Sequence, residues 1–377
     1  MANFENFSKQ GNTSAKPMSE DPSLYPYEAR IGLACVWISV SILGLVGNSL
    51  VIWSVILSKK LRTVTNAFVV NLSVADFWTS LSYPWIAVAL VSHDSWPLES
   101  EVPCIIAACQ LYTGLGASLY TLASIALNRA VLITQPMNTY RFWYSPSKVT
   151  VMIAMTWIIP CSLVFIPLIL NIGELGFDPE SNTCSDIDTN PRGEEYNLIQ
   201  SLGFYPAPML IIICCYTALY VHLKRHFRKQ KARNTYQESA TTADKSIGER
   251  SVSLSVITAD TSVSSQRELT ADRSSKSHRQ AINRQQVSIT KNLFLVFCIF
   301  TLLLSPYYIS LAVPSSRKFA LYGVTITIFN SCVNPIIYTI NHPQFKIVLR
   351  KIIQCRLSEI PEPSDFLKSI LTMNRRN

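Results

Sequence analysis

The chain has 377 residues, of which 49% are apolar and only 15% are charged, which is too hydrophobic for a soluble protein of this length. Its net charge of +9 is spread over the loops between apolar runs. That pattern argues against a nucleic acid partner, which would need a basic patch on a folded aqueous surface, and it favours a membrane protein.

The first 30 residues are polar and contain two glycosylation sequons, at Asn6 and Asn12. They lack the apolar core of a cleavable signal peptide, so we expect none. We interpret residues 1–30 as an extracellular tail that is glycosylated at Asn6 and Asn12.

Seven uncharged or nearly uncharged runs follow, each about as long as the 20 or so residues that a helix needs to cross a bilayer. Backbone groups in lipid must be satisfied within their own segment, so each run is expected to be a helix. The sequence therefore predicts an all-α membrane protein with a seven-helix transmembrane domain over residues 31–340. The runs are Ile31 to Leu57, Val64 to Leu90, Pro103 to Leu127, Val149 to Leu170, Tyr196 to Val221, Asn292 to Val313 and Phe319 to Ile340.

Charge predicts the orientation of these helices. The loop after the first run carries Lys59, Lys60 and Arg62 without an acid, whereas the loop between the fourth and fifth runs carries seven acids against Arg192 alone. The positive-inside rule places the basic loops in the cytoplasm. We therefore expect an extracellular N-terminus, a cytoplasmic C-terminus and residence in the plasma membrane.

Two charged residues in or near these runs call for an explanation. Asp76 is the only acid within any of the seven, and a buried carboxylate needs a cation or several hydrogen-bond donors. Arg129 closes the third run, where it either extends to the lipid headgroups or serves a function. The seventh run contains Asn334-Pro335-Ile336-Ile337-Tyr338, and its proline is expected to kink the helix.

The segments outside the spans differ in character. Residues of about 229–283 form a long cytoplasmic loop, rich in Ser and Thr in its middle, which we expect to be disordered. Residues 341–355 are basic and apolar, typical of a short amphipathic helix on the membrane surface, and end at Cys355, a candidate for palmitoylation. Residues 356–377 are expected to be a cytoplasmic tail.

Together, these features resemble rhodopsin-like (class A) G protein-coupled receptors over residues 31–355. The motifs are Gly47-Asn48, Asp76, Asn128-Arg129, Trp157, Pro306 and Asn334-Pro335-x-x-Tyr338. Asn128 departs from the acid that usually precedes the arginine. Phe177-Asp178-Pro179, Cys184-Ser185 and a sixth span without tryptophan before its proline resemble the Moody and trapped-in-endoderm receptors, and more distantly the medium-chain fatty acid and melatonin receptors.

This resemblance implies roles for particular residues. An extracellular disulfide is expected between Cys104 and Cys184, the two cysteines that lie on the oxidising side. No cofactor is implied, although an allosteric sodium ion is expected at Asp76, Ser118, Asn330, Ser331 and Asn334; a protonated Asp76 in a water cluster is the alternative. The switch that couples to a heterotrimeric G protein is expected to comprise Asn128, Arg129, Pro136, Tyr216, Asn334, Pro335 and Tyr338. A receptor kinase, arrestin and membrane lipid are further implied partners.

The ligand is less well defined by the sequence. Leu111 stands where aminergic receptors carry an aspartate, which argues against amines, and no lysine between Ala320 and Ile340 could hold retinal. A neutral, largely aromatic pocket is expected, which suits a lipid-like molecule, whereas the acidic loop suits a peptide. The expected pocket residues are Leu111, Tyr112, Tyr307, Tyr308 and Tyr322.

Two other classes of membrane protein fit the sequence less well. A seven-span transporter or channel would need internal repeats or several intramembrane charges, and the sequence has one acid and no repeat. A membrane enzyme would need a catalytic cluster, yet the five histidines all lie at span ends or in loops. In many relatives, acids at the positions of Asn128 and Gln286 restrain the arginine, so their absence here predicts signalling without ligand. The alternative is that Tyr216, Tyr338 or a loop contact restrains Arg129 instead.

Overall fold

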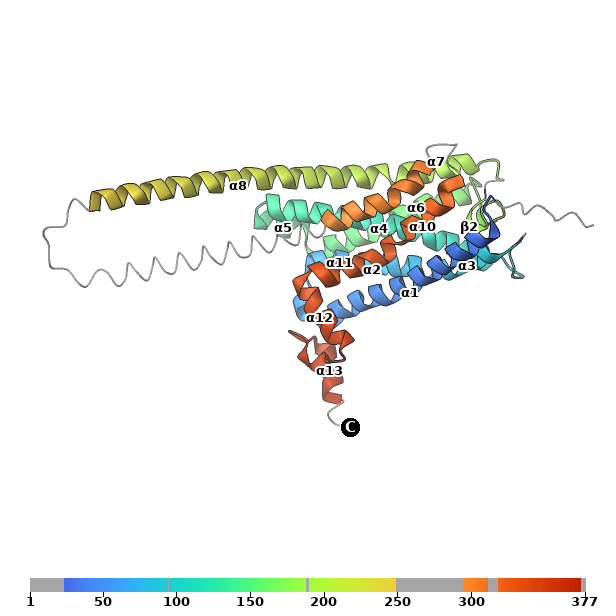
Figure 1. Cartoon of the computed structure of the whole chain (residues 1–377), viewed down its shortest axis with the longest axis horizontal. Coiled ribbons are helices and arrows are strands. Elements are labelled where there is room, and N and C mark those ends of the chain that lie inside the picture. The colour runs from blue at the N-terminus through green and yellow to red at the C-terminus, as the bar shows by residue number, and fades with distance from the viewer. Residues whose placement is uncertain (1–23, 94, 188–189, 249–293, 311–317, 374–377) are drawn as a thin grey trace, which may run out of the picture.

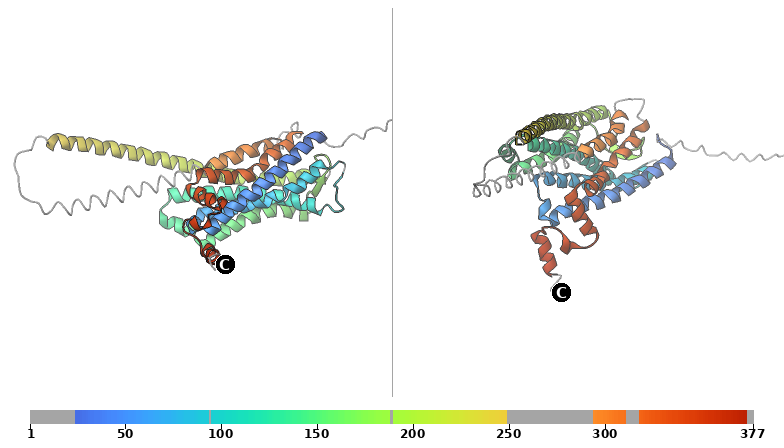
Figure 2. Two further views of the ribbon diagram at one scale, coloured as in Figure 1. Left: turned by 60° about the horizontal axis from the view of Figure 1, so that its bottom comes forward. Right: turned by 60° about the vertical axis from the view of Figure 1, so that its left-hand side comes forward.

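In this computed structural model, residues 24–93, 95–187, 190–248, 294–310 and 318–373 are described. Among them, six helical segments are long and apolar enough to cross a membrane, and the helix Phe294–Ser310 is shorter but also apolar. They lie side by side as a bundle, confirming the predicted seven-helix architecture (Figures 1 and 2). The six longer segments are Tyr27–Leu57, Val64–Val91, Val102–Thr134, Pro146–Ile169, Gly193–Arg225 and Ala320–Ile340.

Three of the seven spans are interrupted rather than continuous. The second divides into α2 (Val64–Ser80) and α3 (Tyr83–Val91), because Pro84 at the start of α3 has no N–H for the helical ladder. The fifth divides into α7 (Gly193–Phe204) and α8 (Pro206–Gly248), again at a proline, and the seventh into α10 (Ala320–Ile328) and α11 (Asn330–Asn341). The first span, α1 (Tyr27–Leu57), begins four residues before the expected start at Ile31.

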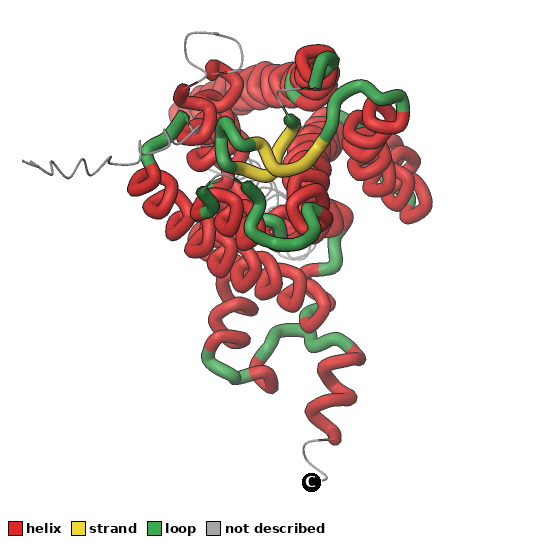
Figure 3. The backbone as a smooth tube through the Cα atoms, turned by 90° about the vertical axis from the view of Figure 1, so that its right-hand side faces the viewer, coloured by secondary structure: helices red, strands yellow, loops and turns green. Residues whose placement is uncertain are grey.

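The two ends of the bundle carry different elements. At one end, strands β1 (Leu175–Asp178) and β2 (Thr183–Asp186) pair antiparallel, with Phe177 opposite Cys184. Figure 3 shows this hairpin lying across the mouth of the bundle. At the other end lie α5 (Met137–Trp143), which follows α4 (Val102–Thr134), and the expected amphipathic helix α12 (Pro343–Ile353). We call these the hairpin end and the α12 end.

The helices pack through small residues and a buried apolar core. A Cβ atom at Gly47 of α1 would lie 3.0 Å from the Pro335 ring of α11, so glycine permits the close approach of these two helices. The largest buried cluster includes Phe68, Ile125 and Phe345, which lie on α2, α4 and α12. This core therefore joins α12 to the bundle and fixes its position under the spans.

The long loop after the fifth span differs from the expectation. Helix α8 continues as far as Gly248, so the prediction of disorder from residue 229 is wrong for residues 229–248 (Figure 1). This stretch contains Lys, Arg, Gln, Ala and Glu and has no proline, and these are good helix formers. The remainder of the predicted disordered segment, from residue 249, lies outside the described residues.

The chain after α12 is folded rather than a simple tail. A 3₁₀ turn, η3 (Leu357–Glu359), leads to the helix α13 (Asp365–Met373), which lies beside the end of α1. The turn between α12 and η3 places Cys355 in the left-handed region, with φ of 55°. The Arg356 N–H bonds to the carbonyl of Lys351 and the Cys355 N–H to that of Ile352, the Schellman arrangement that ends a helix.

Candidate functional site

The buried carboxylate of Asp76 lies at the centre of the bundle and is held by two neighbouring helices. Ser118 Oγ of α4 donates to Asp76 Oδ1 at 2.7 Å, and Asn334 Nδ2 of α11 donates to Asp76 Oδ2 at 2.7 Å. All three residues are at most 2% exposed, so the interactions are shielded from water. Asp76 thus connects α2, α4 and α11 through two side-chain hydrogen bonds.

Ser331, also expected around a sodium ion, is bonded to other partners. Ser331 Oγ shares a 2.7 Å hydrogen bond with the Tyr83 hydroxyl, and Asn48 Nδ2 donates to the Ser331 carbonyl at 2.7 Å. The buried atoms Asn48 Oδ1 and Asn330 Nδ2 have no hydrogen-bond partner among the described residues. A carboxylate, two hydroxyls and an unsatisfied amide oxygen are the ligand chemistry that a hard cation prefers.

Asn128 and Arg129 lie at the α12 end of α4 and are both buried. The Thr65 hydroxyl of α2 donates to Asn128 Oδ1 at 2.8 Å, and Asn128 Nδ2 donates to the Tyr140 hydroxyl of α5 at 3.2 Å. Asn128 therefore joins α2, α4 and α5 through neutral hydrogen bonds. Gln286 is the second position at which the lack of an acid predicts ligand-independent signalling, and it lies outside the described residues.

The remaining switch residues surround the same end of the bundle. The Tyr216 ring packs edge-on against Phe294, with centroids 4.9 Å apart, so α8 contacts the Phe294–Ser310 helix. The Tyr338 ring stacks on Phe345 at 5.9 Å, which couples α11 to α12. Pro335 lies within α11, and Pro136 immediately precedes α5.

His342 lies between α11 and α12 and was not selected from the sequence. Its Nδ1 accepts the Phe345 N–H at 3.4 Å, so its side chain caps the start of α12. Burial, and to a lesser extent the nearby Arg129 cation, lowers the pKa of His342 to about 4. The imidazole is therefore neutral at pH 7 and keeps its capping acceptor.

In a second polar cluster, the sequence pointed to Trp157 but not to its partners. Asn71 Nδ2 donates to the hydroxyls of Thr121 and Thr156 at 2.7 and 3.0 Å, and Trp157 Nε1 donates to Asn71 Oδ1 at 2.9 Å. This cluster joins α2, α4 and α6 (Pro146–Ile169). Asn71 begins the Asn-Leu-Ser sequon inside the second span, and its burial excludes glycosylation there. The available signal was that Asn71 is one of two amides in the second apolar run.

At the hairpin end, Cys104 of α4 and Cys184 of β2 are joined by a disulfide, as the sequence led us to expect. The Tyr112 hydroxyl donates to Asp186 Oδ1 at 2.6 Å, which ties the end of β2 to the same helix. The hairpin is thus fixed covalently and by a charge-assisted hydrogen bond over the mouth of the bundle.

A cavity of about 40 Å³ lies beneath the hairpin, between α4, α7 and the Phe294–Ser310 helix. Four of the five expected pocket residues line it, and none of its lining residues is charged. Tyr322, the fifth expected residue, does not line the cavity. Its ring lies edge-on against the ring of Tyr25, with centroids 5.8 Å apart, so the prediction that it belongs to this pocket is wrong. The lining residues are Leu111, Tyr112, Leu115, Gly116, Leu119, Asn197, Gln200, Ser201, Phe204, Phe300, Leu304, Tyr307, Tyr308 and Val324.

The cavity contains a polar group that sequence reasoning missed. Gln200 is 7% exposed, and within the described part of the chain its side chain interacts with the Tyr196 hydroxyl without the geometry of a full hydrogen bond. A buried amide whose hydrogen bond is poorly formed is costly, so a ligand atom that accepts from it with better geometry would gain affinity. The signal in the sequence was a glutamine one helical turn beyond Tyr196, within an apolar run.

Of the three expected modification sites, the structure describes one. Cys355 is exposed in the turn after α12, where a thiol is accessible. Asn6 and Asn12 lie outside the described residues.

Comparison with known proteins identifies a family model and relatives that match this chain. The sequence model of the family described as 7 transmembrane receptor (rhodopsin family) matches residues 47–338. The G-protein coupled receptor moody of Drosophila melanogaster is 26% identical over 349 residues, which cover 86% of this chain and 51% of the relative. Protein trapped in endoderm-1 of Drosophila melanogaster is 27% identical over 230 residues, which cover 60% of this chain and 57% of the relative. The chain spans about half the length of these relatives.

The fold agrees with a solved structure of the same architecture. Squid rhodopsin superposes with a TM-score of 0.66 at 20% identity, covering 92% of this chain and 91% of that chain. The helical bundle and the match over most of its length lead to one conclusion: the chain belongs to the rhodopsin family of seven-transmembrane receptors.

Proposed function

We propose that this protein is a plasma-membrane receptor that transmits the binding of an extracellular ligand to a heterotrimeric G protein. The observation that carries the proposal is the position of two sites on one helix, α4. Tyr112 of α4 lines the cavity under the hairpin, and Arg129 of the same helix lies buried at the α12 end. Because one helix carries both, a ligand that shifts α4 changes the environment of Arg129.

The proposed orientation places the hairpin end outside the cell and the α12 end in the cytoplasm. The basic residues Lys59, Lys60 and Arg62 lie in the loop after α1 at the α12 end, as positive-inside topology requires. A disulfide at the hairpin end agrees with an oxidising exterior. In this orientation, Asn6 and Asn12 are accessible for glycosylation and Cys355 for palmitoylation, and a receptor kinase and arrestin would act on the cytoplasmic face.

We further propose that the ligand is a small, uncharged molecule with a hydrogen-bond acceptor. A charged ligand would lose its hydration without an opposite charge, because no lining side chain is charged. The Gln200 amide offers a donor for a carbonyl or ether oxygen, while Leu111, Phe300 and Leu304 favour an apolar body. Small esters and amides fit this description better than amines, free fatty acids or cationic peptides, and a ligand larger than the 40 Å³ cavity would have to displace lining side chains.

The Asp76 site supports the proposal of an allosteric sodium ion. Asp76, Ser118 and Ser331 supply a carboxylate and two hydroxyls, and Asn48 Oδ1 supplies a further unsatisfied oxygen. When bound, the ion would neutralise the buried carboxylate. The chain's own residues hold Asp76 between α4 and α11, and this arrangement would differ between two receptor states.

The test is a screen of neutral lipids, esters, amides, fatty acids and peptides on the full-length receptor in nanodiscs, with nucleotide exchange on a panel of G proteins as the readout. We expect an uncharged agonist, and Gln200→Leu should weaken its potency about tenfold, because one hydrogen bond of about 1.4 kcal/mol is lost. Tyr322→Phe removes a hydroxyl outside the cavity and serves as the matched control.

Two results would contradict the proposal. A charged agonist whose potency is insensitive to Gln200→Leu would overturn the ligand assignment but leave the receptor function standing. A ligand-dependent current or substrate flux in proteoliposomes without G protein would instead support the transporter or channel alternative.

A further inference from the structure

The segment after α12 folds back onto the end of α1 through backbone hydrogen bonds. The Ser364 N–H donates to the Leu57 carbonyl at 2.9 Å, and the Lys59 N–H donates to the Glu362 carbonyl at 2.8 Å. The Ser58 hydroxyl donates to the Pro361 carbonyl at 2.8 Å. The segment therefore satisfies backbone groups that the end of α1 leaves without helical partners.

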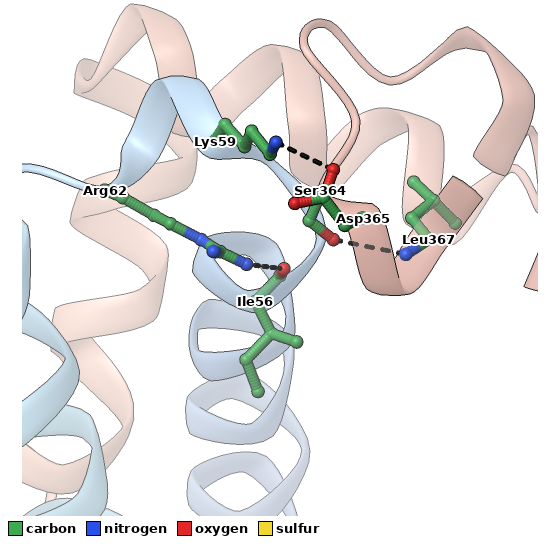
Figure 4. A network of polar contacts seen from close by, with 6 residues as sticks. All are labelled: Ile56, Lys59, Arg62, Ser364, Asp365 and Leu367. Atoms are coloured by element: carbon green, nitrogen blue, oxygen red, sulfur yellow. Dashed lines mark hydrogen bonds and ion pairs between the residues drawn. The ribbon is translucent and has the colours of Figure 1, made fainter. Parts of the chain in front are cut away.

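Side chains reinforce this attachment. Ile360, Ser364 and Leu367 are at most 3% exposed, and the Ser364 hydroxyl accepts the Leu367 N–H at 3.2 Å, which caps α13. Figure 4 shows Lys59 of η1 (Lys59–Leu61) reaching Asp365, with which it pairs at 2.8 Å. We call residues Leu357–Met373 the clasp.

Helix α13 has more apolar surface than its contact with the protein buries. Leu367 faces the core, whereas Phe366 and Met373 remain 51% and 69% exposed. These two residues are seven positions apart and so lie on one face of the helix. Ser369, three positions after Phe366 and four before Met373, lies on the same side of the helix, whereas the exposed residues Lys368 and Thr372 lie on the other side. The helix is therefore amphipathic, and we call the side that carries Lys368 and Thr372 its polar arc.

This apolar face continues the outer surface of α1. The Phe366 ring stacks on Trp53, with centroids 6.5 Å apart and planes inclined by 23°. Trp53 and Val46 are 47% and 56% exposed on one face of α1, which crosses the membrane. Surface of a spanning helix that no other helix covers contacts lipid, and tryptophan is enriched where acyl chains meet headgroups.

We propose that α13 is a second membrane-surface helix, whose Phe366 and Met373 enter the acyl chains of the leaflet at the α12 end. The clasp then ties α12 and the end of α1 to that leaflet, and its polar arc faces the headgroups and water. The Phe366 ring stacks on Trp53, which lies on the lipid-facing surface of α1, so lipid also covers the exposed apolar face of α13. This inference rests on the membrane-spanning bundle and is independent of ligand and G protein.

The experiment uses the full-length protein in nanodiscs whose phospholipids carry a photoactivatable diazirine on one acyl chain. After irradiation, tryptic peptides are mapped by mass spectrometry. We expect acyl adducts on the peptides that contain Phe366 and Met373, and on Trp53 as an internal standard. The double variant Phe366→Glu, Met373→Glu should lose the adducts on α13. Its control, Lys368→Gln with Thr372→Glu, makes the same change of charge on the polar arc and should keep them.

Hydrogen exchange of the α13 amides in each variant distinguishes loss of lipid contact from loss of the helix. If the variant Phe366→Glu, Met373→Glu keeps its protection but loses the adducts, the apolar face binds lipid. Wild-type protein without adducts on residues 357–373, while Trp53 is labelled, would overturn the proposal. So would equal labelling of the two double variants, or adducts between two copies of the chain at Phe366.

Discussion

The Thr65 hydroxyl donates a hydrogen bond to Asn128 Oδ1 across 2.8 Å, and this contact fixes the residue that precedes Arg129. An aspartate at position 128 would accept the same bond but would also place a negative charge beside the buried arginine. Asparagine cannot supply that charge, so it contributes only neutral hydrogen bonds. Such bonds are worth about 1 kcal/mol, against about 1.5–3 kcal/mol for bonds to charged groups.

We therefore predict that the receptor activates its G protein without ligand, and that Asn128→Asp lowers this basal activity. A gain of about 1.4 kcal/mol for the inactive state would shift the populations tenfold. The measurement is ligand-free nucleotide exchange on a reconstituted G protein. Asn128→Asp combined with Gln286→Glu should lower the exchange further.

Thr65→Val provides the control, because it removes the contact to Asn128 without adding charge. It should not reproduce the effect of Asn128→Asp. A wild-type receptor with no basal exchange, or a series in which exchange does not change, would show that other contacts restrain Arg129.

Sodium should stabilise the wild-type protein and have no effect on Asp76→Asn. A ligand at ten times its Kd adds about 1.4 kcal/mol to the stability of the state that binds it. Thermal unfolding in sodium and in potassium chloride of equal ionic strength measures this difference. Asp76→Asn keeps the side-chain size but lacks the charge that holds a cation. Equal sodium sensitivity of both proteins would exclude this site.

Loss of the disulfide should destabilise the hairpin end. The bond between Cys104 and Cys184 closes a loop across 80 residues of sequence, worth about 4 kcal/mol in the chain-entropy model. Cys104→Ser with Cys184→Ser should lower thermal stability, whereas Cys35→Ser, which removes a free exposed thiol, should not. A free thiol at either position in surface-expressed protein would contradict the pairing.

The sequence predicted the spans well because length and hydrophobicity alone identify a membrane helix. The α6 helix begins at Pro146, three residues before the expected start at Val149. The interruption of the second span was missed, although Pro84 was visible in the run. Asp76 was identified because an acid in an apolar run is conspicuous, and two of its partners, Ser118 and Asn334, were chosen correctly.

Tertiary contacts were harder to predict. The clasp is attached by hydrogen bonds to the Leu57 carbonyl and from the Ser58 hydroxyl, which the sequence does not encode in any local pattern. Tyr322 has the aromatic chemistry of a pocket residue, yet the direction of its side chain depends on how α10 rotates against α1. His342 was treated as a loop residue because its burial depends on the angle between α11 and α12.

His342 makes the attachment of α12 sensitive to acid. Its pKa is about 4 in the folded protein and about 6.5 when exposed, so the detached state binds the proton more tightly. Stability is therefore complete above pH 6.5 and is lost as the pH falls toward 4. At pH 5 this loss should reach about 2 kcal/mol relative to pH 8, since one pKa unit is worth about 1.4 kcal/mol.

Hydrogen exchange of the α12 amides between pH 8 and pH 5, corrected for the intrinsic rate, measures this loss. We expect protection to fall with acid in the wild type and to become much less dependent on pH in His342→Asn. Asparagine keeps an acceptor for the Phe345 N–H but does not titrate, so helix capping is preserved while the proton-binding group is removed. Protonated His342 cannot accept this hydrogen bond through Nδ1, and it would lie near the Arg129 cation. Equal pH dependence in the two proteins would show that another group controls the attachment of α12.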